Sequence, residues 1–309
     1  MRRISERSVD GTGKAVDCTR LMKKFVKRTL IFLVLMIAVI AGFVFFKSRS
    51  RLGKTYTVAE HRIVVPQSAA AIAEGKRLYI SRGCIDCHGA DLSGATFLDA
   101  GPIGRYTGSN LTKGKGGSAA RLNDVEFERA LRHGVSKNGK PLVFMPSVDF
   151  AGMSDEDTGR LIAYIRSAPP VDKVSPRQKI GPLARVLYVA GKMPLLTSAE
   201  MIDHNAQSPA KVDPTVSADY GKYIAQTCTG CHGMNLAGGP IPGAPPEWPP
   251  AQDIRGKALS KYNEAQFIQS IKTGKRPDGS EIRFPMPWKN FSQMTETEIK
   301  ALFLYLKTL

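Results

Sequence analysis

Cys84-Ile85-Asp86-Cys87-His88 recurs later in the chain as Cys228-Thr229-Gly230-Cys231-His232. Cys-x-x-Cys-His is the pattern by which a haem is attached covalently to protein. Two cysteines three positions apart can each form a thioether with a vinyl group on one edge of the porphyrin, and the next histidine is then held under the iron. The sequence therefore predicts two covalently attached haem c groups, with these attachment cysteines and proximal histidines: Cys84, Cys87, His88, Cys228, Cys231 and His232.

Two other uses of paired cysteines are less favoured. A zinc site built from two Cys-x-x-Cys pairs usually places them about 15–20 residues apart, and here they are much farther apart. A thioredoxin-like redox pair leaves both histidines unexplained, and it is expected next to a βαβ unit that the sequence does not indicate.

The positive charge of the chain is concentrated near its N-terminus. The 309 residues carry a formal charge of +17, and residues 1–60 hold 13 Lys or Arg against 4 Asp or Glu. This basic cluster flanks an apolar segment, so nucleic-acid binding is a poor explanation for it. The length has room for two domains of about 150 residues each.

The apolar segment is Thr29 to Phe46, eighteen residues without a charge. As a helix it spans roughly 27 Å, enough to cross the core of a bilayer. Nine Lys or Arg precede it, which favours a cytoplasmic location for residues 1–28. A cleaved signal peptide is the alternative, although the apolar run is longer than the usual 7–15 residues. Cys18 is expected to be a free thiol without function.

Two domains of similar plan are predicted, at 60–168 and 216–309, with a linker at 169–215 between them. The linker is rich in proline and lacks a long periodic run. Its apolar part, 183–196, is expected to pack on a domain surface. His204, also in the linker, has no counterpart in the first domain and is expected to be an ordinary surface histidine.

Helix signals are clear in the first domain. Residues 68–82 are rich in helix formers and lead directly to the first Cys-x-x-Cys-His. Asn123 and Ser154 have the sequence context of helix N-caps. The glycine-rich stretch 89–117 is expected to be a loop rather than a regular element.

The second domain repeats this plan, which indicates a duplication. His88 to Gly94 resembles His232 to Gly238. The other matched positions of the first and second domains are Gly75 and Gly221, Asn123 and Asn263, Phe127 and Phe267, Gly134 and Gly274, Met153 and Met294, and Tyr164 and Tyr305.

The duplication also identifies candidates for the sixth ligand of each iron. Met145 and Met286 lie 57 and 54 residues after their proximal histidines, and a proline follows each. A proline beside the ligand stiffens the loop that presents sulfur to iron. The other shared pair, Met153 and Met294, sits just before an N-cap, where an apolar residue usually packs. Met145 and Met286 are therefore the predicted axial ligands.

Two histidines of the first domain are weaker candidates for this role. His133 is replaced by Thr273 at the matched position of the second domain, so it is expected to be a partly exposed helix residue. His61 is expected to be solvated.

Both halves resemble class I cytochrome c domains. The resemblance covers about residues 75–300 and is carried by the two Cys-x-x-Cys-His motifs, the Met-Pro loops, and the run from Phe144 to Val171. It implies an all-α fold of tandem class I cytochrome c domains behind the N-terminal transmembrane helix. The run CHGADLSGA is typical of dihaem and trihaem cytochromes that serve periplasmic alcohol, aldehyde and sugar dehydrogenases. This sequence differs from the trihaem subunits in having two haem motifs and an N-terminal anchor.

The resemblance implies a bacterial protein held in the cytoplasmic membrane by a single helix, with its haem domains in the periplasm. The expected function is electron transfer in a respiratory chain, with a periplasmic dehydrogenase as donor and a terminal oxidase as acceptor. His/Met ligation raises the reduction potential, which suits such an acceptor. No catalytic residue is predicted. A dihaem peroxidase and a haem-based sensor are the alternatives, and the matched Met-Pro loops argue against the peroxidase because it needs an open iron.

Overall fold

The computed structural model describes residues 8–9, 15–16, 18–245 and 247–309. The chain divides into two compact units, Met1–Ser50 and Arg51–Leu309, which are described separately. Helices make up 46% of the described residues and strands 6%. The predicted helix-rich architecture is therefore confirmed, but a small sheet accompanies it.

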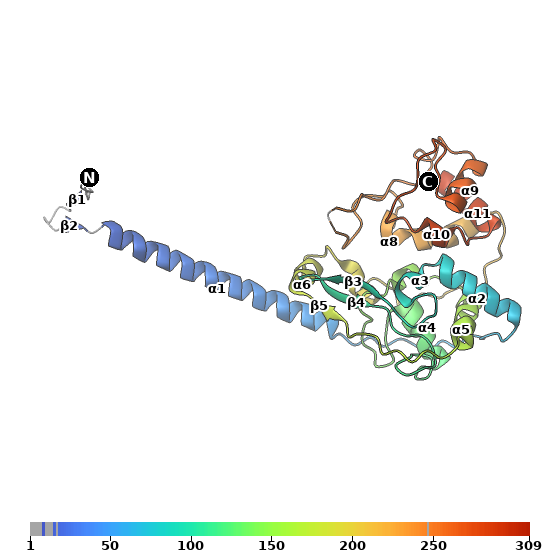
Figure 1. Cartoon of the computed structure of the whole chain (residues 1–309), viewed down its shortest axis with the longest axis horizontal. Coiled ribbons are helices and arrows are strands. Elements are labelled where there is room, and N and C mark those ends of the chain that lie inside the picture. Colours follow the sequence, from blue (N-terminus) through green and yellow to red (C-terminus); the bar gives the residue numbers. More distant parts are fainter. Residues whose placement is uncertain (1–7, 10–14, 17, 246) are drawn as a thin grey trace. The chain divides into compact units, whose positions relative to one another are not determined.

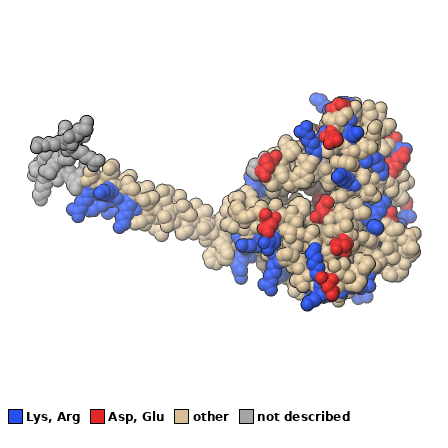
Figure 2. All heavy atoms as spheres, viewed as in Figure 1, with Lys and Arg blue, Asp and Glu red and all other residues tan. Residues whose placement is uncertain are grey.

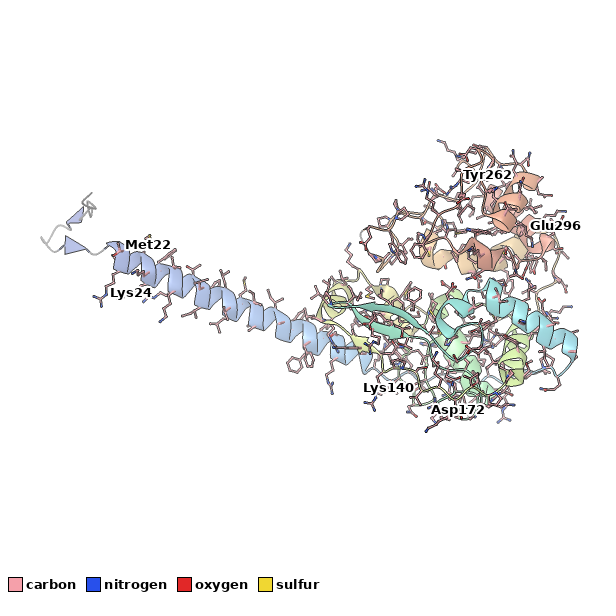
Figure 3. The ribbon with its side chains drawn as sticks, viewed as in Figure 1. Met22, Lys24, Lys140, Asp172, Tyr262 and Glu296 are labelled. Carbon is pink, nitrogen blue, oxygen red and sulfur yellow. The ribbon has the colours of Figure 1, made fainter. Side chains whose placement is uncertain are left out.

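The first unit is dominated by the helix α1, Cys18–Leu52. It contains the predicted apolar segment, and the described apolar window of this helix is fully exposed. Lys and Arg side chains gather at its N-terminal end, followed by a long uncharged stretch (Figure 2). Met22 and Lys24 project from this end (Figure 3). The antiparallel strands β1, Ser8–Val9, and β2, Ala15–Val16, precede it; the side chain of Cys18 lies outside the described residues.

The first haem-motif domain begins after α1, and its helix signals are confirmed. Ser68 caps α2, Asn123 forms a capping box with Glu126, and Ser154 caps the last helix of the domain. The helices of this domain are α2 (Ala69–Ser81), α3 (Cys84–His88), α4 (Asp124–His133), the 3-10 helix η1 (Ser147–Asp149) and α5 (Asp155–Ser167).

The second domain repeats these elements, as the duplication predicts. Asn263 forms a capping box with Gln266, and Thr295 forms another with Glu298. The helices of this domain are α7 (Ala218–Ala225), the 3-10 helix η3 (Gln226–Cys228), α8 (Thr229–His232), α9 (Glu264–Thr273), α10 (Trp288–Phe291) and α11 (Glu296–Lys307).

A close helix crossing lies at the centre of each domain. In the first domain α2 packs against α5, and in the second α7 packs against α11 (Figure 1). A Cβ atom on Gly75 would lie 2.0 Å from the carbonyl oxygen of Arg160, and one on Gly221 would lie 2.0 Å from that of Ala301. The matched tyrosines, Tyr164 and Tyr305, are the next neighbours in each case. Only glycine leaves room for this approach.

The glycine-rich stretch 89–117 is not entirely a loop, so that prediction was wrong. It contains the strands β3, Thr96–Ala100, and β4, Gly104–Thr107. β4 also pairs with β5, Lys179–Ile180, from the linker, which gives an antiparallel sheet of order β3-β4-β5. Thr, Phe, Leu and Tyr in these short runs favour strands, but the glycines around them mask the signal. In the corresponding part of the second domain, the described residues form one bridge, between Gly239 and Ala251.

The apolar part of the linker packs as predicted. It forms α6, Pro182–Val189, and the 3-10 helix η2, Pro194–Glu200. Tyr188 and Leu196 from these helices are fully buried and pack with Tyr106 of β4 in a third hydrophobic cluster. The other two clusters are the cores of the two haem-motif domains.

Replacing the crossing glycines tests this packing. Gly75→Ala and Gly221→Ala each insert a Cβ into the 2.0 Å contact with a backbone oxygen. Each is expected to lower the free energy of unfolding of its own domain by about 1–3 kcal/mol, because overpacking forces the helices apart. Chemical denaturation measures the change. The exposed neighbours Lys76 and Lys222 supply matched controls, since Lys76→Ala and Lys222→Ala should stay within about 0.5 kcal/mol. Equal losses at glycine and lysine would contradict the close crossing.

Candidate haem sites

Each Cys-x-x-Cys-His motif folds as a short helical turn. The first is α3, which begins after Gly83 in the left-handed conformation (φ 76°). The second runs from the end of η3 through α8. Gly89 and Gly233 end the two turns with φ of 78° and 77°, values that favour glycine. The duplicated motifs thus end in the same backbone geometry, although they begin differently.

The histidines of the two motifs are buried and oriented alike. His88 is 9% exposed and His232 is 8% exposed. Nδ1 of His88 lies 2.8 Å from the carbonyl oxygen of Ser109, and Nδ1 of His232 lies 2.7 Å from that of Gln252. A carbonyl can only accept, so Nδ1 carries the proton and Nε2 keeps its lone pair. Burial lowers the pKa of both imidazoles, which favours the neutral form that binds a metal.

The motif cysteines are unpaired thiols. Burial raises the pKa of Cys84, Cys87 and Cys228 to about 12 and raises that of Cys231 as well. The raised pKa values keep these thiols protonated, unlike the reactive thiolates of redox pairs. The two pairs also belong to different domains, and no three His, Cys, Asp or Glu side chains in the described part of the chain form a metal-binding group. The residues fit a covalently attached porphyrin better than either alternative.

The structure brings each predicted axial methionine to the core that contains its haem motif. Met145 is partly buried against the same cluster as Cys84. Met286 is partly buried against the cluster that includes Cys228. The competing methionines are core residues, because Met153 is 4% exposed and Met294 is 3% exposed. They occupy the helix-entry positions that the sequence predicts for them.

The other histidines lie away from these turns. Nδ1 of His133 is 3.1 Å from Nδ1 of His204, and Nε2 of His61 is 2.9 Å from Oδ1 of Asp155. Burial lowers the pKa of His133 to about 4, and the neighbouring His204 adds to this effect. These histidines therefore have partners of their own and are accounted for without iron.

The two Met-Pro loops differ in what covers them. In the first, the ring of Phe144 stacks on Tyr106 with 4.5 Å between centroids, and its amide donates to the carbonyl of Leu196. The Met145 carbonyl accepts a 2.7 Å hydrogen bond from Ser198 Oγ. In the second loop, Phe284 is 69% exposed. Leu196 and Ser198 of the linker thus bond the first loop, a long-range contact that no local signal in the sequence predicts.

Comparison with known proteins agrees with the duplicated site. The model of the family described as Cytochrome c matches residues 72–169 and 218–309. These two matches contain all six motif residues and both Met-Pro sequences.

Among curated proteins, the chain is 26% identical over 297 residues to an alcohol dehydrogenase (quinone) cytochrome c subunit of Gluconacetobacter polyoxogenes, covering 84% of this chain and 62% of that relative. It is 25% identical over 266 residues to a fructose dehydrogenase cytochrome subunit of Gluconobacter japonicus, covering 77% and 52%. It is also 29% identical over 171 residues to a gluconate 2-dehydrogenase cytochrome c subunit of Pantoea cypripedii, covering 53% and 38%. The chain thus spans less than two thirds of the length of each of these relatives.

Removing the Ser198 hydroxyl tests whether the linker steadies the first loop. Ser198→Ala removes one of two donors to the Met145 carbonyl, which keeps its bond from the Ser147 amide, at a cost of about 0.5–1.5 kcal/mol. In the haem-loaded protein, the charge-transfer band of the methionine-bound ferric iron is expected to lose about half its intensity at a lower temperature than in the wild type, because one of two loops has lost its support. Ser292→Ala, near the second loop, is the control, since the Ser292 hydroxyl bonds only the nearby Lys289 carbonyl. Equal melting of the band in both variants would contradict this role.

Proposed function

The chain belongs to the cytochrome c family, and on that premise we propose that it is a dihaem electron carrier that accepts and passes on one electron per haem. The carrying observation is the duplicated turn, in which each buried motif histidine has its Nδ1 proton bonded to a backbone carbonyl. That bond fixes the ring and leaves Nε2 for the iron.

Within each domain the cysteines, the histidine and the methionine are proposed to have different roles. Cys84 and Cys87 would hold the first haem, and Cys228 and Cys231 the second. His88 and His232 would be proximal ligands, with Met145 and Met286 on the opposite faces. When bound, the haem supplies the one-electron couple, and His/Met ligation raises its potential relative to other axial pairs. With a histidine and a methionine to hold it, each iron would be closed to substrate, which suits a carrier rather than a peroxidase.

The proposed donor is a periplasmic dehydrogenase. The relatives with alcohol, gluconate and fructose dehydrogenase in their names are cytochrome subunits, so this chain is proposed to serve such an enzyme as its electron-transfer subunit. A terminal oxidase is the proposed acceptor, because the ligand set favours a high potential.

We propose that α1 anchors the protein in the bacterial cytoplasmic membrane. Its exposed apolar window matches the thickness of a bilayer core. The Lys and Arg residues before Thr29 favour a cytoplasmic N-terminus by the positive-inside rule, which leaves the haem domains in the periplasm.

The axial assignment is tested by comparing ligands with core methionines. Met145→Ala and Met286→Ala should each open one iron, lower its reduction potential and allow that haem to bind carbon monoxide, while pyridine haemochrome analysis still finds two haems per chain. Met153→Ala and Met294→Ala, at buried positions, should cost about 2–5 kcal/mol of stability and leave the spectrum of the folded protein unchanged. The wild type should bind no carbon monoxide.

Two results would reject these assignments. Ligand loss in the Met153 or Met294 variant, with wild-type spectra in the other two, would reverse the choice of methionines. Carbon monoxide binding by the reduced wild-type protein would favour the peroxidase.

The membrane proposal predicts that the native protein keeps its N-terminal helix. High salt should leave it in the membrane fraction and detergent should release it, since the anchor is apolar. An alkaline phosphatase fusion after residue 60 should be active, and one after residue 20 should not. A mature chain that begins near Gly42 and is removed from membranes by salt would mean that the segment is a cleaved signal.

A further inference from the structure

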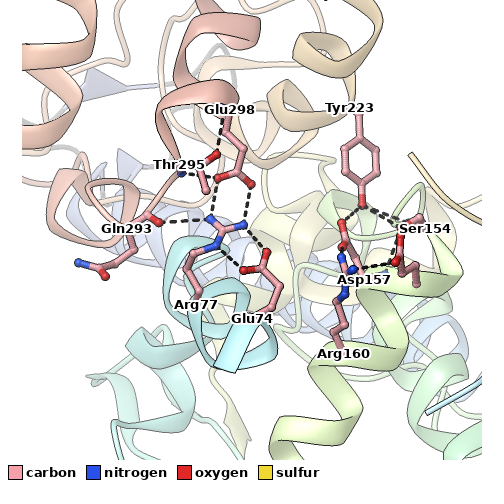
Figure 4. A network of polar contacts seen from close by, with 10 residues as sticks. Glu74, Arg77, Ser154, Asp157, Arg160, Tyr223, Gln293, Thr295 and Glu298 are labelled. Atoms are coloured by element: carbon pink, nitrogen blue, oxygen red, sulfur yellow. Dashed lines mark hydrogen bonds and ion pairs between the residues drawn. The ribbon is translucent and has the colours of Figure 1, made fainter. Parts of the chain in front are cut away.

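The two haem-motif domains contact each other through residues that occupy matched positions. A residue of the first domain contacts the second domain, and its match in the second domain contacts the first. Arg77 of α2 reaches the second domain, where its guanidinium bonds the carboxylate of Glu298 at 2.6 and 3.0 Å. Tyr223 of α7, the residue matched to Arg77, reaches the first domain and donates to Asp157 Oδ2 at 2.7 Å. Asp157 is in turn matched to Glu298, and each is the third residue of the last helix of its domain (Figure 4).

Further bonds join the same side chains to the backbone at or near the start of these helices. The amide of Ser154 donates to the Tyr223 hydroxyl at 3.2 Å. In the other direction, Arg77 also donates to the carbonyl of Gln293, two residues before the N-cap Thr295 (Figure 4). A contact from residue i to residue j that recurs from the match of i to the match of j defines an approximate two-fold interface.

A second pair of contacts follows the same symmetry and involves the haem motifs. Asn290 Nδ2 donates to Asp86 Oδ2 at 2.7 Å. Thr229 Oγ1 lies 3.2 Å from Asp149 Oδ1, and a Cβ on Gly230 would lie 2.8 Å from Asp149 Oδ2. Asp149 and Asn290 each lie four residues after the predicted axial methionine of their own domain. Each therefore touches the middle of the other domain's Cys-x-x-Cys-His motif.

Direct contact also joins the segments before the motifs. Arg82, two residues before Cys84, donates to the hydroxyl of Thr227, which precedes Cys228. Arg82 is only 7% exposed. The two attachment turns thus lie at the interface rather than on opposite sides of the protein.

These contacts are buried and specific in geometry. The Glu298 side chain is 3% exposed and that of Arg77 is 19% exposed. A buried ion pair adds little net stability because its charges are desolvated, but its geometry can select one arrangement. Burial also raises the pKa of Asp149 to about 7. The contact of this carboxyl with the second motif therefore destabilises its charged form.

We propose that this interface positions the two haems for direct electron exchange, with Arg77 and Tyr223 as clamps and with Asp149 and Asn290 as bridges to the opposite motif. The inference rests on the proposed function. In the exchange, one electron leaves the ferrous iron of one domain, which becomes ferric, and reduces the ferric iron of the other. No bond is made or broken and no proton is transferred. These side chains are positioning residues.

The clamps are tested with the haem-loaded full chain and the double variant Arg77→Gln, Tyr223→Phe. The matched control is Lys300→Gln, which breaks the 2.6 Å ion pair between Lys300 and Glu296 within α11. Two readouts are compared: the distance between nitroxides at Lys76→Cys and Lys222→Cys in a Cys18→Ser background, and the rate of intramolecular electron transfer after one haem is reduced by a light pulse.

The expected result is one narrow distance distribution in the wild type and the control, and a broadened one in the double variant. Electron transfer should slow about tenfold in the double variant, because loss of position by an ångström or more is costly for a reaction that depends on geometry. The visible spectra and the haem count should stay as in the wild type, since no ligand is changed.

The bridges are tested by Asp149→Ala against Asp149→Asn. Asparagine is the matched residue of the second domain, so Asp149→Asn should keep the wild-type rate, whereas Asp149→Ala, alone or with Asn290→Ala, should slow it. Unchanged distances and rates in the clamp and bridge variants would overturn the inference. A wild-type protein that exchanges no electrons between its haems would also overturn it. A chain without haem would instead refute the proposed function.

Discussion

Each domain depends on a crossing of two helices at a distance that only glycine allows. A side chain at Gly75 or Gly221 would collide with a backbone oxygen of the facing helix. The crossing brings the first helix of each domain against the last, which closes the core. It also fixes the position of the haem motif, because the motif starts within a few residues of the end of the first helix. The first turn of the last helix, α5 or α11, is then contacted by a side chain of the other domain.

The parts of the fold that the sequence predicts well are those with local signals. The capping boxes at Asn123 and Asn263 mark the starts of α4 and α9, and a glycine marks the end of each helix. Each signal lies within four or five consecutive residues, so it can be read from the local sequence. The sheet was missed because β4 pairs with β5 from the linker, far away in sequence. Strands of two to five residues gain their stability from such pairing and not from propensity. The cover that Ser198 provides over the Met145 loop was missed for the same reason.

The haem motifs and the Met-Pro pairs could be found because a duplication gives each candidate an internal comparison. That comparison fails at the interface between the domains. Arg77 and Tyr223 are matched in position but not in chemistry, and so are Asp86 and Gly230. A two-fold interface needs complementary surfaces, not identical ones, once the two halves are encoded separately. An arginine facing a glutamate and a tyrosine facing an aspartate satisfy the same requirement, so only the contacts reveal the symmetry.

The symmetry holds at the face that joins the domains and is lost at the Met-Pro loops. Between the domains, the contacts of Arg77 and Asn290 have counterparts in those of Tyr223 and Asp149. At the loops, Phe144 stacks on Tyr106 and its amide donates to Leu196 of the linker. Phe284 is exposed and meets only the edge of Trp248 among the described aromatic residues. Burial around an iron destabilises its more highly charged oxidised state and so raises its reduction potential, whereas solvent exposure has the opposite effect. The linker between the two copies therefore gives the first Met-Pro loop surroundings that differ from those of the second.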